Sequence, residues 1–243
     1  AVVVAQNGEV FTGATLEPGN AHAEIVALNA AAHHAQNATL FSTLEPCNHT
    51  GRTGPCTQAI IDAGVSRVVV GTLDPDSKVS GSGVQHLRDA GLTVDVGVLE
   101  QEVKQQLAAY LHHRATGRPF VVLKMASTID GRIAATDGSS KWITGETARK
   151  RVHQLRAESD AIVVGAGTVR ADDPSLTVRD ADGPSPRRIV LGTIDASAKV
   201  HPCTQWTGTL PDLLDTLGKE GEVQLLVEGG ARVAASFHRE RLI

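Results

Sequence analysis

Apolar segments with two different periodicities alternate along the first half of the chain. Short runs rich in β-branched residues are typical of strands, and Asn7-Gly8 between the first two runs is typical of a hairpin turn. Longer segments carry apolar residues at helical spacing, and Gly64 marks the end of one of them. The predicted strands are 1–5, 10–12, 39–43, 67–71 and 93–98, and the predicted helices are 22–34, 56–63, 83–90 and 100–114. This alternation predicts a sheet with helices on its faces.

The stretch Ala115-Thr-Gly-Arg-Pro119 interrupts the alternation, and we place a domain boundary there. It separates a domain of residues 1–115 from a domain of residues 116–243. The pattern then starts again, with an apolar strand that ends at Gly165 and further elements in the remainder. These are strands at 120–124, 189–191 and 223–227 and a helix at 232–237, whereas residues 199–210 show little strand character. We therefore expect two α/β domains.

Length and composition restrict the class of protein. With 243 residues, of which 41% are hydrophobic, the chain can build one large or two modest cores. A net charge of -4 disfavours a general nucleic-acid-binding surface. A membrane span needs an apolar run of about 18 residues, and no run in the sequence is near that length. Residues 1–4 lack the basic start of a signal peptide, and the three cysteines are an odd number. We expect a cytoplasmic protein without membrane or nucleic-acid partners.

Candidate chemistry concentrates in three short stretches of the first domain, namely His22-Ala-Glu24, Pro46-Cys47 and Pro55-Cys56. One imidazole and two thiolates are suitable ligands for Zn²⁺, and three protein ligands leave the fourth tetrahedral position open. Zinc lowers the pKa of a bound water to about 7, and Glu24 is a candidate to move protons between that water and a leaving nitrogen. This pattern is typical of zinc deaminases, although eight residues instead of two separate the cysteines here.

The helix predicted to start at His22 imposes a geometric condition on this site. Two residues of helical spacing turn by about 200°, so His22 and Glu24 can face one point only if His22 lies near the helix N-cap. Cys56 is expected at a helix N-terminus, where the helix dipole favours the thiolate. The turn-rich loop between the cysteines is expected to present His49 and Arg52 to a substrate, with His49 as a metal ligand the alternative.

With these residues the chain resembles a known family. His22-Ala-Glu24, residues 43–56 and Asp74-Pro-Asp76 resemble the deaminase half of the bifunctional riboflavin-biosynthesis deaminase/reductase, the RibD family. The insertion between the cysteines separates that family from simple cytidine deaminases. The resemblance implies a cytidine-deaminase-like three-layer domain and substrate contacts from Asp74 and Asp76, with a solvated acidic turn as the alternative for Asp76.

Several segments of the second half resemble the reductase half of the same family, whose fold is similar to dihydrofolate reductase. They are residues 124–134, 140–144, 160–165, 168–179 and 226–230. The resemblance implies NADPH as a cofactor. The matching cofactor positions are Ala126, Trp142, Thr168, Asp172, Thr193, Gly230, Ala231, Arg232, Val233, Ala234, Ala235 and Ser236. The matching substrate positions are Lys124, Ser140, Arg156, Leu176, Arg179 and Glu228.

Two strand-glycine-helix junctions in the second half favour nucleotide binding independently of the resemblance. Gly165-Ala-Gly167 follows an apolar strand, but Arg170 occupies the third glycine position of a GxGxxG motif, so the Rossmann fingerprint fails. Gly229-Gly230-Ala231 follows a second strand. Small residues at both junctions let backbone N–H groups approach the phosphates of a dinucleotide. The role of Arg187-Arg188 stays open: the pair could bind a 2′-phosphate, or it could be a basic edge before the strand at 189–191.

Together the two resemblances imply one bifunctional enzyme. Its first domain deaminates 2,5-diamino-6-ribosylamino-4(3H)-pyrimidinone 5′-phosphate, and its second reduces the ribosyl group to ribityl with NADPH. Arg156 and Arg179 suit the sugar phosphate because a guanidinium binds phosphate bidentately. The family also implies a homodimer or homotetramer and a chain longer at both ends, so we expect the reductase domain to be incomplete. Two alternatives stay open: a nucleoside or tRNA zinc deaminase with an unrelated C-terminal domain, and a zinc-stabilised binding protein.

Overall fold

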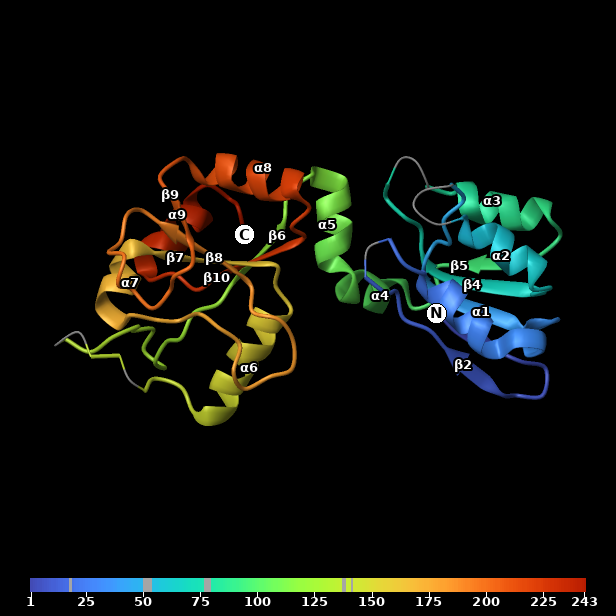
Figure 1. Cartoon of the computed structure of the whole chain (residues 1–243), viewed down its shortest axis with the longest axis horizontal. Coiled ribbons are helices and arrows are strands. Elements are labelled where there is room, and N and C mark those ends of the chain that lie inside the picture. Colours follow the sequence, from blue (N-terminus) through green and yellow to red (C-terminus); the bar gives the residue numbers. More distant parts are fainter. Residues whose placement is uncertain (18, 50–53, 77–79, 137–138, 141) are drawn as a thin grey trace. The chain divides into compact units, whose positions relative to one another are not determined.

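The computed structural model describes residues 1–17, 19–49, 54–76, 80–136, 139–140 and 142–243. The chain divides into two compact units, unit 1 (Ala1–Leu111) and unit 2 (His112–Ile243), and most of their elements are labelled in Figure 1. The division falls within helix α5 (Ala108–Thr116). In the described part of the chain, no helix has both the length and the apolar character that crossing a membrane requires.

Unit 1 is built around a five-stranded sheet in the order β2-β1-β3-β4-β5. Its strands are β1 (Val2–Val4), β2 (Val10–Thr12), β3 (Thr39–Leu44), β4 (Arg67–Thr72) and β5 (Thr93–Val96). The first two form the antiparallel hairpin expected at Asn7-Gly8, where Gly8 has a φ of 86° that favours glycine. β3, β4 and β5 run parallel, so their carboxyl ends lie at one edge of the sheet.

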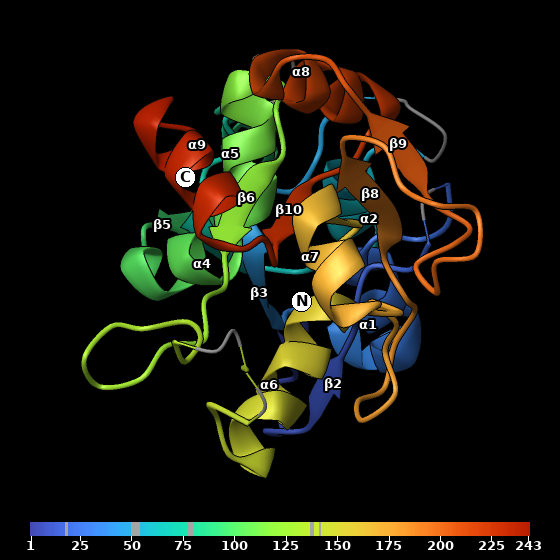
Figure 2. The same ribbon diagram turned by 90° about the vertical axis from the view of Figure 1, so that its left-hand side faces the viewer.

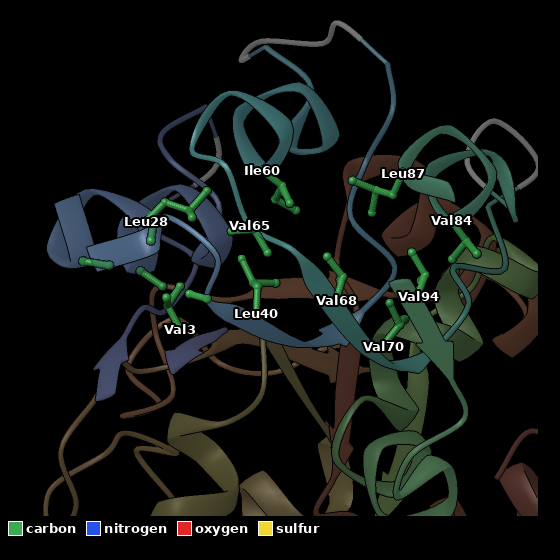
Figure 3. Packing of buried hydrophobic residues seen from close by; sticks show 14 residues of the cluster. Val3, Leu28, Leu40, Ile60, Val65, Val68, Val70, Val84, Leu87 and Val94 are labelled. Carbon is green, nitrogen blue, oxygen red and sulfur yellow. The ribbon is translucent and has the colours of Figure 1, made fainter. Parts of the chain in front are cut away.

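Three helices cover one face of this sheet, and the core of unit 1 lies between them. They are α1 (Ala23–Ala31), extended by the 3₁₀ helix η1 (Ala32–Ala35), α2 (Cys56–Asp62) and α3 (Ser82–Asp89). Leu40 and Val68 of the sheet and Ile60 and Leu87 of the helices are fully buried in one cluster, which Figure 3 shows from close by. Burial of these apolar side chains stabilises the unit by roughly 25 cal/mol per Å² removed from water.

The opposite face of the sheet is covered by α4 (Glu100–Gln106). A Cβ atom on Gly71 of β4 would lie 2.7 Å from a methyl group of Val103, so the helix and strand meet at a glycine. The single helix predicted for residues 100–114 is wrong, because α4 and α5 meet at Leu107. Val103 is buried whereas α5 buries none of its residues, so the apolar stripe does not continue from one helix to the next.

Unit 2 contains a five-stranded parallel sheet in the order β6-β10-β7-β8-β9. Its strands are β6 (Phe120–Leu123), β7 (Ala161–Gly165), β8 (Arg187–Leu191), β9 (Thr204–Trp206) and β10 (Gln224–Val227). β9 corrects the expectation of little strand character between 199 and 210, since Thr204 pairs with Ile189 and Trp206 with Leu191. An edge strand of three residues needs no apolar run, because tertiary pairing overrides weak β-propensity.

Helices cover both faces of the sheet in unit 2. Consecutive strand residues alternate between the faces: Val163 packs in a cluster with leucines of α8 (Leu210–Glu220), while Ile162 and Val164 pack with Val169 of α7 (Ala166–Asp172). α9 (Ala231–Arg239) shares the α8 side through Phe237, and α6 (Glu146–Ala157) shares the α7 side through Leu155. Figures 1 and 2 both show α8 and α7 on opposite sides of the sheet.

Candidate active sites

The three predicted metal ligands of unit 1 come together. His22 Nδ1 lies 3.5 Å from the Cys47 sulfur and 3.3 Å from the Cys56 sulfur, and all three donor atoms lie within 4.8 Å of one another. A tetrahedral zinc with Zn–N near 2.0 Å and Zn–S near 2.3 Å places its donor atoms roughly 3.5 Å apart. The cluster therefore fits a zinc site.

Local backbone geometry produces this arrangement. His22 is the N-cap residue of α1 with an extended backbone (φ -72°, ψ 163°), so the geometric condition on His22 and Glu24 is met. Cys47 lies in the loop after β3, and Cys56 is the first residue of α2 after the cap residue Pro55. Thus two helix starts and one strand end each supply a ligand.

The pKa values of the two cysteine thiols are shifted in opposite directions. Hydrogen bonds from Cys56, together with the nearby His22, lower the pKa of the Cys47 thiol to about 5. The hydrogen bond to Cys47 and burial raise the pKa of Cys56 above its usual range. Cys47 is thus poised as the thiolate that zinc binds, and metal binding would release the proton held by Cys56.

Glu24 lies on the first turn of α1 and is buried, with 7% of its surface exposed. Burial raises the pKa of its carboxyl group, while the charge of His22 lowers it and that of Cys47 raises it. Glu24 follows the cluster residue His22 by two positions at the start of the helix. A carboxyl group whose pKa is moved toward neutrality can both accept and donate a proton. This is what a general acid/base in a deaminase requires.

Glu45, two residues before Cys47, is a buried carboxylate that the sequence patterns did not single out. Its two oxygens accept four backbone N–H bonds of 2.9 to 3.3 Å, from Asp74, Gly81, Gly83 and Val84. Three of these donors belong to the N-terminal region of α3, where unpaired N–H groups and the helix dipole favour a negative charge. Glu45 therefore ties the metal loop to α3 and to the loop after β4.

Gly83→Ala is expected to break this tie. A Cβ atom at position 83 would lie 2.0 Å from the carbonyl oxygen of Pro46, so backbone next to Cys47 must move. Overpacking of this kind costs about 1–3 kcal/mol, and we expect the variant to lose that much stability and to hold zinc more weakly. Urea unfolding and zinc content per chain measure the two effects. Gly54→Ala is the matched control, since nothing lies within 4 Å of a Cβ there; equal behaviour of the two variants would contradict the prediction.

The other predicted substrate residues of unit 1 have different settings. Asp74 is buried, with one carboxylate oxygen accepting the Asp76 backbone N–H at 2.9 Å and the other accepting the Tyr110 hydroxyl at 3.0 Å. Asp74 thus shapes its own loop, and Tyr110 is a partner that sequence patterns did not indicate. Asp76 is half-buried and His49 is exposed, two residues beyond Cys47, whereas Arg52 lies outside the described residues.

In unit 2, Lys124, Arg156 and Glu228 form a charged cluster between α6 and the ends of β6 and β10. Arg156 donates two hydrogen bonds to the Glu228 carboxylate, at 2.7 and 2.9 Å, and the Lys124 ammonium lies 3.7 Å from it. The side chains of Arg156 and Glu228 are only 11% and 7% exposed. Two cations thus share one buried carboxylate, so the cluster keeps a net positive charge.

Arg179 lies on the same loop that contacts Arg156. Arg156 donates to the carbonyl oxygen of Thr177 at 3.0 Å, while Arg179 donates to the hydroxyl groups of Thr177 and Ser175. The Arg179 backbone N–H donates to Nδ1 of buried His153 at 3.2 Å, so the imidazole proton is on Nε2, 3.5 Å from Asp180. Burial and the two guanidinium groups lower the pKa of His153, which keeps the imidazole neutral.

Two further predicted substrate residues are less closely tied to this cluster. Leu176 is buried between Ser175 and Thr177, with a positive φ of 54° that turns the loop sharply. Ser140 is half-buried in the loop that precedes α6.

A cavity of about 550 Å³ opens where the carboxyl ends of β7, β8 and β10 meet the starts of α7 and α9. It is lined by Gly165, Ala166, Gly167, Thr168, Arg170, Leu191, Gly192, Thr193, Gly230, Ala231, Arg232 and Val233. Both predicted glycine junctions contribute. A Cβ atom on Gly165 or on Gly229 would lie within 2.8 Å of Val233, so glycine is needed for the two junctions to pack closely. At these junctions a phosphate can approach the backbone N–H groups, so the cavity fits a dinucleotide.

The cavity contains only part of the predicted cofactor set. Thr168, Thr193 and residues 230–233 line it, and Arg170, which was considered only as a departure from a glycine motif, lines it too. The remaining positions lie outside the lining: Ala126, Trp142, Asp172, Ala234, Ala235 and Ser236. Ala234 packs in the core, and Trp142 is 73% exposed with Arg149 stacked 4.4 Å above its ring.

Comparisons with known proteins match both units. The model of the RibD C-terminal domain matches residues 119–243, and that of the cytidine and deoxycytidylate deaminase zinc-binding region matches residues 1–72. The riboflavin biosynthesis protein RibD of Corynebacterium ammoniagenes is 43% identical over 255 residues, with 100% of this chain and 75% of that protein covered. The Aquifex aeolicus protein of the same name is 44% identical over 237 residues, with 96% of this chain and 65% of that protein covered.

Solved structures give the same result. RibD of Acinetobacter baumannii matches with a TM-score of 0.89 and 37% identity, covering 100% of this chain and 76% of that one. The diaminohydroxyphosphoribosylaminopyrimidine deaminase/5-amino-6-(5-phosphoribosylamino)uracil reductase of Thermotoga maritima matches with a TM-score of 0.88 and 37% identity, covering 98% and 76%. The predicted fold class is confirmed in both halves. The similarity to these proteins covers both the zinc-binding deaminase unit and the reductase unit. The chain therefore belongs to the RibD family of riboflavin-biosynthesis proteins.

Proposed function

We propose that the chain catalyses two consecutive steps of riboflavin biosynthesis. Unit 1 hydrolyses the 2-amino group of 2,5-diamino-6-ribosylamino-4(3H)-pyrimidinone 5′-phosphate, and unit 2 reduces the ribosyl group of the product to ribityl with NADPH. The observation that carries the proposal is the gathering of His22, Cys47 and Cys56 in a chain of this family, with buried Glu24 two residues after His22. The chain spans 65% to 75% of the length of the two curated relatives described above.

Glu24 moves the proton in the deamination. His22, Cys47 and Cys56 would hold a zinc ion, which would lower the pKa of a bound water to about 7. As the water oxygen bonds to C2 of the pyrimidine, Glu24 accepts a proton from it and passes one to the amino nitrogen. The C2–N bond then breaks, ammonia leaves, and a carbonyl group remains at C2. The raised pKa of Glu24 supports this double role.

Lys124, Arg156 and Arg179 act on the substrate of the reductase. NADPH, which the residues lining the cavity would hold, would supply a hydride to C1′ of the ring-opened imine, and the imine nitrogen would take up a proton. Arg156 and Arg179 bind the 5′-phosphate, since both donate hydrogen bonds to Thr177 and guanidinium groups suit phosphate. Lys124 supplies the proton, because it belongs to the charged cluster, whereas Asp172 is exposed and does not line the cavity.

The setting of the enzyme follows from the same proposal. It acts on small molecules in the cytoplasm, where a reducing environment suits a chain with two of its three cysteines in a metal cluster. It assembles as a homodimer or homotetramer, which sedimentation of the purified chain would measure.

The proposal is tested with the purified chain and the diaminopyrimidine ribotide, with and without NADPH. We expect ammonia release without NADPH, and loss of NADPH absorbance only when both compounds are present. A zinc chelator should stop ammonia release but leave reduction of a substrate that has already been deaminated. Ammonia from cytidine or adenosine with no effect of NADPH would favour a nucleoside or tRNA deaminase instead, and absence of both signals would reject the bifunctional enzyme.

A further inference from the structure

We propose that Arg170 makes the reductase prefer NADPH over NADH, by binding the 2′-phosphate of the adenosine moiety. The inference deepens the proposed reductase function and rests on it. Arg170 lies on α7, and its side chain lines the cavity at the carboxyl ends of β7, β8 and β10. The 2′-phosphate is the only chemical difference between the two dinucleotides, so a residue that binds it sets the choice between them.

The strand order determines which end of the cavity receives the adenosine moiety. Lys124 follows β6 and Glu228 follows β10, so the charged cluster lies on the β6-β10 side of the sheet. The nicotinamide must approach a substrate bound there. The cavity extends from β10 across β7 to Leu191 and Thr193 at the end of β8. The far, adenosine end of a dinucleotide therefore lies on the β8 side.

Among the described residues that line the cavity, Arg170 is the cation on that side. Its Nη1 donates to the carbonyl oxygen of Thr193, just after β8, at 3.3 Å. One such bond leaves most of the five N–H donors of the guanidinium for another acceptor. The described residues of the lining include Arg170 and Arg232 but no acidic side chain, so an anion meets no repulsion there. Arg232 lies on α9, which follows β10, so it is on the side of the cavity away from β8, where the parts that NADPH and NADH share would bind.

Arg187 and Arg188, which the sequence also offered as a 2′-phosphate site, lie too far from the cavity to bind this phosphate. They begin β8, at the end opposite Leu191 and the cavity. Arg187 pairs with Glu220 and lies 3.7 Å from Glu222, while Arg188 donates to the carbonyl oxygen of His201. Both therefore belong to the amino-terminal edge of the sheet.

The test is calorimetric titration of the full chain with NADPH and with NADH. We expect the wild type to bind NADPH more tightly. Arg170→Ala should raise the Kd for NADPH about tenfold, the effect of losing a charge-assisted contact, and leave the Kd for NADH unchanged. Arg232→Ala should weaken both dinucleotides, and Arg187→Ala neither. Salt should weaken wild-type binding of NADPH more than that of NADH, because it screens the exposed phosphate contact.

The outcomes separate this inference from the proposed function. If Arg170→Ala weakens both dinucleotides equally, or neither, Arg170 does not select NADPH although the reductase function stands. If the wild type binds neither dinucleotide, the reductase function fails and the inference with it. Arg170 is exposed, so its replacement should not disturb folding; an unchanged circular dichroism spectrum checks this. Arg170→Lys should recover part of the preference, since it restores the charge without the guanidinium geometry.

Discussion

Glu24→Gln is expected to lower the rate of deamination by about 10²–10⁴-fold, the usual contribution of a general acid/base. The amide has nearly the same shape as the carboxylate but cannot accept a proton from water or return one to the leaving nitrogen. His22, Cys47 and Cys56 keep their positions, because none of their contacts with one another involves Glu24. Ammonia release and zinc content, measured on the same preparation, should therefore diverge: activity falls while one zinc per chain remains.

The matched control is Glu17→Gln, an exposed glutamate of the same unit, which should retain full activity. Reduction of an already deaminated substrate should also be unchanged in Glu24→Gln, since the reducing residues belong to unit 2. If the Gln variant deaminates as well as the wild type, the role of Glu24 is wrong, and the cluster would be the structural site of a zinc-stabilised binding protein.

Glu228→Leu is expected to destabilise unit 2 by about 3–5 kcal/mol, the usual cost of leaving a buried charge without its partner. The guanidinium of Arg156 loses both of its hydrogen bonds to the carboxylate, and Lys124 loses its counterion. Both tryptophans of the chain, Trp142 and Trp206, belong to unit 2, so tryptophan fluorescence during urea unfolding reports on this unit alone. Reduction of the substrate should be lost as well, because Arg156 is no longer held beside the site.

A double variant separates the stability effect from the chemical one. Arg156→Met combined with Glu228→Leu removes both charges, and replacing a buried pair by apolar residues is often neutral or stabilising. We therefore expect it to recover much of the stability and none of the reductase activity. Glu158→Leu is the control, since its pair with Arg151 is exposed and such pairs contribute about 0–1 kcal/mol. A loss in Glu228→Leu no larger than in this control would show that the buried pair contributes little.

Local features of the site could be predicted from the sequence. The spacing of His22 and Glu24 at the start of a helix required His22 to lie near the N-cap, and it is the N-cap residue. The two Pro-Cys pairs placed their thiols at a strand end and at a helix start, and the glycines after β7 and β10 indicated a dinucleotide cavity. These features depend on hydrogen-bonding needs and backbone freedom within a few residues, so residue types and spacing are enough to reveal them.

The sequence by itself thus determined the strand-helix alternation, the three residues of the metal cluster and the glycine junctions, which are set by short-range periodicity and chemistry. Only the tertiary structure decided the partners that lie far apart along the chain. Glu45 accepts bonds from residues 29 to 39 positions later, Arg156 pairs with Glu228 72 positions away, and β9 exists because β8 offers an unpaired edge. The physical reason is that the position of a charged or polar residue in the sequence does not indicate which distant residue it will contact. Which carboxylates, amides and arginines become partners depends on which of them the folded chain buries next to one another.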